Sequence, residues 1–165
     1  MMKKMIAAAL ALVMMMALAA CGSNGGSSDT AKEAPDLNKY FTDFMTSLGE
    51  DNAPMMMELD ADMTEAFYPG LKDIETKQKV MQAAGMSAVP FEFALVEVAN
   101  ADDAAKVQEI FTARKDAQVA GGAWYPETIA AWEKGEIIVK GNVVALIVAG
   151  ETQADAVDAF NKLFA

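Results

Sequence analysis

The sequence predicts a single α+β domain, with a mainly antiparallel sheet of about four to five strands and helices packed on it. Three patterns support this class. Apolar runs over 91–98, 136–140 and 143–148 predict strands, and the two-residue turn Gly141-Asn142 joins the last two into a hairpin. Segments with helical apolar spacing alternate with the strands, as in folds that pack helices on a sheet. No internal repeat is present.

The first predicted helix follows Pro35-Asp36, with Asp36 as its N-cap. Apolar residues then recur with the spacing of one buried helix face, and Gly49 ends the helix. These apolar residues are Leu37, Tyr40, Phe41, Phe44 and Leu48.

Residues 55–59 predict a short strand, and Asp60 is expected to cap a brief helix that ends at Tyr68-Pro69-Gly70. Met55, Met56 and Met57 are consecutive, so two of them share a strand face. They could form an adaptable peptide-binding or soft-metal surface, but we expect them to fill the core. Residues 77–86 fit a helix or an exposed strand, and strand is favoured because Pro90 and the next strand follow closely.

Strand 91–98 carries apolar side chains on both faces, which predicts a central position in the sheet. The longest helix is expected over 100–120, with acidic residues at its start, basic residues near its end, and Gly121-Gly122 after it. A short helix should follow Pro126. A final helix is expected over 152–164, with Thr152 and Asp155 as a near capping box.

The N-terminus carries the pattern of an export signal. Lys3-Lys4 precede an apolar run, and the small residues Ala19-Ala20 precede Cys21, the single cysteine of the chain. This arrangement resembles the lipobox of bacterial lipoproteins, in which a diacylglycerol thioether forms on the cysteine before cleavage. We therefore expect residues 1–20 to be a cleaved lipoprotein signal peptide and Cys21 to be the lipid attachment site. The run of apolar residues is shorter than the about 20 that a spanning helix needs.

Residues 21–35 are expected to be the lipidated cysteine and a flexible Gly/Ser linker, and residues 36–165 a single extracytoplasmic domain. This organisation predicts a protein on the outer face of the cytoplasmic membrane, in the cell envelope, held there by its lipid.

Composition excludes several function classes. The formal net charge is −11 and no cluster of Lys and Arg occurs, which argues against a nucleic-acid partner. The chain has no histidine, so no Ser-His or Cys-His nucleophile can form. With Cys21 lipidated, the usual ligands of zinc, copper and haem are missing as well. We expect no cofactor and no metal, and no catalytic residues stand out.

Arg114 is the only arginine of the chain, and it falls on the apolar stripe of its helix with Val107, Ile110 and Phe111. A guanidinium group can bind a carboxylate through two parallel hydrogen bonds while partly desolvated. Glu92, on an otherwise apolar strand face, is the expected partner in a structural pair. The alternative is a ligand carboxylate or phosphate at Arg114.

Both tryptophans lie within nine positions of each other, Trp124 and Trp132, with Tyr125 and Glu127 between them. Such aromatic residues beside an acid could stack on a sugar ring of cell-wall glycan. The plainer interpretation is that Trp132 and one neighbour cover the end of the sheet. The candidate ligand contacts are therefore Arg114, Trp124, Tyr125 and Glu127.

Several features in order carry a family resemblance: the lipobox-like start, Glu92 in its strand, the helix with Arg114, Tyr125-Pro126-Glu127, and the Lys140-Gly141-Asn142 hairpin. With them the chain, from Tyr68 to its end, resembles an uncharacterised domain-of-unknown-function family of Gram-positive, clostridia-like bacterial lipoproteins. The resemblance implies an envelope location and an α+β fold, and no reaction.

The sequence thus predicts a membrane-tethered extracytoplasmic lipoprotein, and a non-catalytic protein-interaction or scaffold module with a protein or peptide partner. The alternative is a lipoprotein that binds a small ligand or cell-wall glycan.

Overall fold

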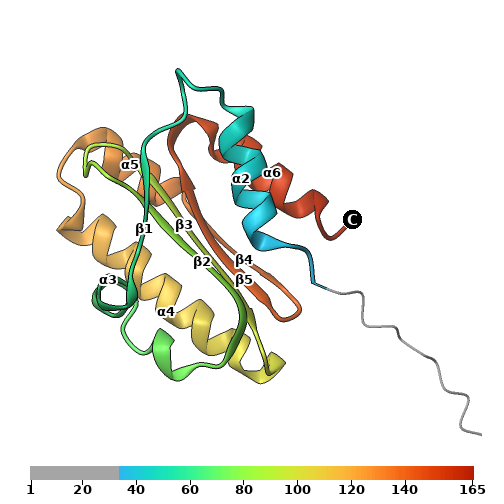
Figure 1. Cartoon of the computed structure of the whole chain (residues 1–165). Coiled ribbons are helices and arrows are strands. Elements are labelled where there is room, and N and C mark those ends of the chain that lie inside the picture. The colour runs from blue at the N-terminus through green and yellow to red at the C-terminus, as the bar shows by residue number, and fades with distance from the viewer. Residues whose placement is uncertain (1–33) are drawn as a thin grey trace, which may run out of the picture. The chain divides into compact units, whose positions relative to one another are not determined.

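Five antiparallel strands form one open sheet in the order β1-β2-β3-β5-β4 (Figure 1). They are β1 (Met56–Glu58), β2 (Thr76–Ala84), β3 (Phe91–Val98), β4 (Glu136–Lys140) and β5 (Val143–Ala149). The computed structural model describes residues 34–165, which form one compact unit. The predicted signal peptide (1–20), Cys21 and most of the predicted linker lie outside the described residues.

Five α-helices pack on the two faces of this sheet, so the predicted α+β class is confirmed. On one face lie α2 (Leu37–Ser47) and α6 (Gln153–Lys162), and on the other lie α3 (Ala61–Phe67), α4 (Ala104–Ala117) and α5 (Pro126–Lys134) (Figure 1). Among residues 34–165, no helix is long and apolar enough to cross a bilayer.

Central strand β3 contributes side chains to the hydrophobic cores on both faces of the sheet, as its two-sided apolar pattern predicts. Phe93 and Leu95 point into the core under α2 and α6, whereas Ala94 and Val96 point into the core under α3, α4 and α5. Its neighbour β5 is buried along its whole length. Strands that are covered on both faces have continuous apolar sequences, so β3 and β5 are the strands that the sequence predicts most directly.

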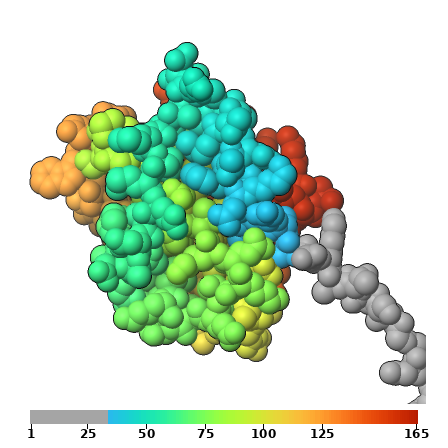
Figure 2. Space-filling model, viewed as in Figure 1, coloured from blue at the N-terminus to red at the C-terminus, as the bar shows by residue number. Residues whose placement is uncertain are grey.

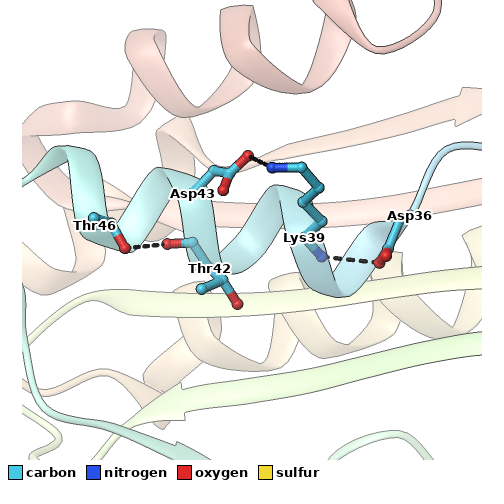
Figure 3. A network of polar contacts seen from close by, with 5 residues as sticks. All are labelled: Asp36, Lys39, Thr42, Asp43 and Thr46. Atoms are coloured by element: carbon cyan, nitrogen blue, oxygen red, sulfur yellow. Dashed lines mark hydrogen bonds and ion pairs between the residues drawn. The ribbon is translucent and has the colours of Figure 1, made fainter.

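Helix α2 begins where the sequence predicts. The Asp36 carboxylate accepts a hydrogen bond from the Lys39 main-chain N–H at 2.9 Å, and the Lys39 ammonium contacts Asp43 at 2.6 Å (Figure 3). One turn further on, the Thr46 hydroxyl donates to the Thr42 carbonyl (Figure 3). The cap satisfies one of the main-chain N–H groups that have no partner within the helix.

Gln78 attaches the start of α2 to the sheet. Its side-chain oxygen accepts from the Leu37 main-chain N–H at 3.0 Å, and its amide nitrogen donates to the Pro35 carbonyl and to Glu97. The Glu97 carboxylate also contacts Lys77 at 3.6 Å, beside the register shift at the start of β2. Because β2 runs from Thr76 to Ala84, segment 77–86 is mostly strand, which agrees with the favoured interpretation of that part of the sequence.

Two local expectations are wrong. Met55 and Met57 are exposed rather than part of the core, because β1 lies at the edge of the sheet, whereas Met56 is half-buried and packs against the core under α2 and α6 as expected. The capping box expected at Thr152 is absent: the Thr152 hydroxyl donates to the Ala149 carbonyl, and the Gln153 side chain bonds Ala149 N–H and the Ile147 carbonyl instead.

Candidate functional site

The sheet face under α3, α4 and α5 contains one buried ion pair. Glu92 on β3 is 3% exposed, and Arg114 reaches it from the last turn of α4. Arg114 Nε lies 2.8 Å from Glu92 Oε1, and Arg114 Nη2 lies 2.7 Å from Glu92 Oε2. The pair is therefore bidentate, in the geometry that favours arginine over lysine.

Tyr68 completes the network from the end of α3, since its hydroxyl donates a short hydrogen bond to Glu92 Oε1. Burial raises the pKa of the Tyr68 phenol well above its usual value, and the Glu92 carboxylate adds to the shift. Desolvation lowers the pKa of Arg114, but the hydrogen bonds and charge of Glu92 outweigh it, so this pKa is raised overall. Tyr68 and Arg114 therefore remain donors to Glu92.

Aromatic rings enclose the guanidinium group. Its central carbon lies 4.1 Å from the ring centre of Phe67 and 5.3 Å from that of Trp132. A cation over ring faces gains about 0.5–2 kcal/mol, more when it is desolvated. The network therefore links α3, α4 and α5 to β3. Both oxygens of Glu92 already accept hydrogen bonds, so this carboxylate is poorly placed to act as a general base.

A small hollow opens over this network, between the β2–β3 connection and the end of α4. It has a volume of about 260 Å³. Arg114, whose side chain is 12% exposed, lines it together with Met86, Val89, Trp132 and Gly122. Figure 2 shows the yellow-green surface of the β2–β3 connection beside the orange surface of the segment that leads into α5.

The other predicted ligand contacts lie elsewhere. Trp124 is 85% exposed and Tyr125 is also exposed, and neither lines the hollow over Arg114. Trp132, by contrast, is buried in the core, as the plainer interpretation of the two tryptophans requires. The four candidate residues therefore do not form one site in the described structure.

Glu127 lines a different hollow, of about 780 Å³, between the end of α2, the start of α5 and the end of β5. Its wall includes Phe91 and the polar side chains of Asn52, Lys134 and Glu151. This hollow falls within the roughly 300–1,000 Å³ of typical small-molecule pockets, whereas the hollow over Arg114 is below it.

Exposed methionines form a third surface feature, here called the methionine patch: Met55, Met57 and Met86. Met55 is 73% exposed and Met86 is 62% exposed. A Cβ added to Gly85 would meet Met55 Cε at 3.3 Å and Met57 Cγ at 3.6 Å, so the first two side chains converge over this glycine. Met86 follows Gly85 directly and borders the hollow over Arg114.

Sequence reasoning missed Tyr68, Phe67 and Met86. The sequence places Tyr68 only in the turn with Pro69-Gly70, and nothing along the chain marks it as the partner of a residue 24 positions later. Met86 lies in the connection between two strands, and its exposure depends on which elements cover that connection.

The described residues hold no group of three or more Asp, Glu, His or Cys side chains that could bind a metal ion. No curated protein and no solved structure matches the chain. The family model described as Domain of unknown function (DUF4358) matches residues 49–149, which run from just before β1 to the end of β5 and include Tyr68, Glu92 and Arg114. This match begins before Tyr68, where the resemblance starts, and covers more than half of the chain. The chain therefore belongs to this domain-of-unknown-function family.

Proposed function

We propose that this protein is a membrane-tethered extracytoplasmic lipoprotein, lipidated on Cys21, and that its domain is a non-catalytic protein-interaction module. The observation that carries the proposal is the methionine patch. Met57 on β1 and Met55 just before it expose apolar area at the edge of the sheet that a solvated domain does not need. Flexible, polarisable methionine side chains are common on surfaces that adapt to peptides.

The partner that fits this surface is an apolar segment of another envelope protein. The hollow beside Met86 is small and partly apolar, with room for a side chain rather than for a whole small molecule. The charge of Arg114 at its base is already compensated by Glu92, so a ligand carboxylate would have to compete with Glu92 for this cation.

Crosslinking in intact cells tests the binding surface. A photoreactive amino acid at position 86 should give adducts with another protein, whereas the same probe at Asp43, exposed on α2 on the other face of the sheet, should not. Met57→Lys, at an exposed position, should reduce the adducts at position 86 without affecting the fold. Equal adducts at both positions, or adducts that persist in Met57→Lys, would contradict the proposal.

The membrane tether has its own test. Cells fed a labelled fatty acid should incorporate the label into the unmodified chain and not into Cys21→Ser, and only the unmodified chain should fractionate with membranes. If the chain carries no label and keeps an intact thiol, the proposed lipidation is wrong. That result would not bear on the proposed binding surface.

The second candidate is a lipoprotein that binds a small ligand or glycan, and the hollow lined by Glu127 favours it because of its size and its polar wall. Titration with soluble cell-wall glycan fragments should then shift the amide NMR signals of α5 and of the α2 end. Glu127→Gln should weaken that response, and an unchanged spectrum would exclude cell-wall glycan as the ligand of this hollow.

A further inference from the structure

The outer edge of β4 is open in the described part of the chain. The sheet ends at β1 on one side and at β4 on the other. β1 has three residues, a length that limits edge pairing, whereas β4 has five, Glu136-Ile137-Ile138-Val139-Lys140. The isoleucines and the valine favour strands strongly, and Val139 is 40% exposed. An edge of this kind is a template for another strand.

The hairpin fixes which main-chain groups of β4 point outward. In a hairpin with a two-residue turn, the flanking pair Lys140 and Val143 exchanges both hydrogen bonds, and bonded pairs then alternate. The Asn142 carbonyl accepts from Val98 N–H at 2.9 Å on the β3 side, which agrees with this alternation. The N–H and C=O groups of Ile137 and Val139 are therefore those that point away from β5.

This edge is complementary to itself. We infer that β4 pairs antiparallel with β4 of a second copy of the chain, with Ile138 on the two-fold axis, so that the two sheets become one. In this register Ile137 lies opposite Val139 of the other copy, and the outward N–H and C=O groups of each meet those of the other. Glu136 then lies opposite Lys140 at both ends, in two opposite-charge pairs.

Other registers lose this match. A shift by one residue sets outward main-chain groups against inward ones, and a shift by two places Glu136 or Lys140 opposite an uncharged residue of the other strand. The side chains also support the central register. Ile138 packs against the core under α2 and α6, and Ile137 against the other core, so pairing extends both apolar layers across the axis.

Disulfide trapping in intact cells tests the register. In the proposed pairing Ile138 meets its own copy in a non-hydrogen-bonded pair, where Cα atoms lie about 4.5 Å apart, within the range of a disulfide. The full chain with Ile138→Cys should form a covalent dimer under mild oxidation. The matched control Val139→Cys, one residue further on, points to the other sheet face and opposite Ile137, so it should not. The unmodified chain reports any crosslinking through Cys21.

Charge reversal gives a second test on exposed positions. Glu136→Lys and Lys140→Glu each convert both end pairs to like charges and should weaken dimer trapping through Ile138→Cys by about tenfold. Co-production of the two variants restores opposite charges at both ends, so a mixed dimer should form. A net-charge effect on solubility would not produce that rescue.

Several outcomes overturn the inference. If Ile138→Cys gives no more covalent dimer than Val139→Cys, this register is excluded. If neither charge reversal lowers the yield of covalent dimer, the charge pairs are excluded. Failure of the mixed pair to recover does the same. A monomer throughout would mean that this edge does not pair with a second copy, and a crosslink to a different protein would mean that another partner covers it.

Discussion

Arg114→Leu should destabilise the domain strongly. The substitution leaves the carboxylate of Glu92 buried, with Tyr68 as its one remaining hydrogen-bond donor among those described. Removing one partner of a buried ion pair costs about 3–5 kcal/mol, because the charge left behind is no longer compensated. Since Tyr68 still donates, we expect a loss near about 3 kcal/mol in the free energy of unfolding, measured by urea denaturation followed by circular dichroism.

A double-mutant cycle separates the pair from the general cost of altering the core. Glu92→Leu should also cost about 3 kcal/mol, because it leaves a cation and the Tyr68 hydroxyl without an acceptor. The double variant removes both charges, so its cost should fall to about 1–3 kcal/mol, that of the unpaired hydroxyl. The coupling energy is then about 3–5 kcal/mol. A change below about 1 kcal/mol in Arg114→Leu, with no coupling to Glu92, would refute the reasoning.

Three further outcomes follow from the described contacts. Asp36→Ala should lower the free energy of unfolding by about 1 kcal/mol through loss of the α2 cap, whereas Asp43→Ala, which breaks an exposed ion pair, should change it little; urea denaturation compares the two. Gln78→Ala should raise the amide hydrogen exchange of α2 above that of the sheet, and uniform exchange would argue against local attachment. Burial raises the pKa of Tyr40 and of Tyr68 above that of an unfolded tyrosine, near about 10. The folded chain therefore holds these protons longer than the unfolded chain, so stability should fall as the pH rises above about 10. In absorbance titrations both phenols should ionise only as the protein unfolds, and early ionisation would contradict their burial.

The sequence predicts best those strands and helices whose burial follows from the pattern of apolar residues within the element itself. Strands β3 and β5 are apolar on both faces, and the Gly141-Asn142 turn fixes β4 as the neighbour of β5. Segment 77–86 was ambiguous because Gln78 and the lysines beside it lie at the polar end of a strand that becomes apolar only from Val80.

Exposure at the edge of the sheet could not be predicted. Met55 and Met57 read as core residues because their strand is apolar, but whether a helix covers them depends on tertiary packing. The candidate ligand contacts show the same limit. Arg114 stood out as the only arginine on an apolar stripe, and its neighbour Glu92 was identifiable, whereas Tyr68 and Phe67 reach the pair only through the fold.

The attachment at Gln78 also has a mechanical consequence. A pulling force applied at residue 34, where the described chain begins, acts first on the hydrogen bonds of Gln78 to Pro35 and Leu37. These bonds transmit the force to β2. Helix α2 should then detach before any strand separates, so pulling on the chain from this end would lengthen it in two stages. The sheet would remain folded under loads that have already released its first helix.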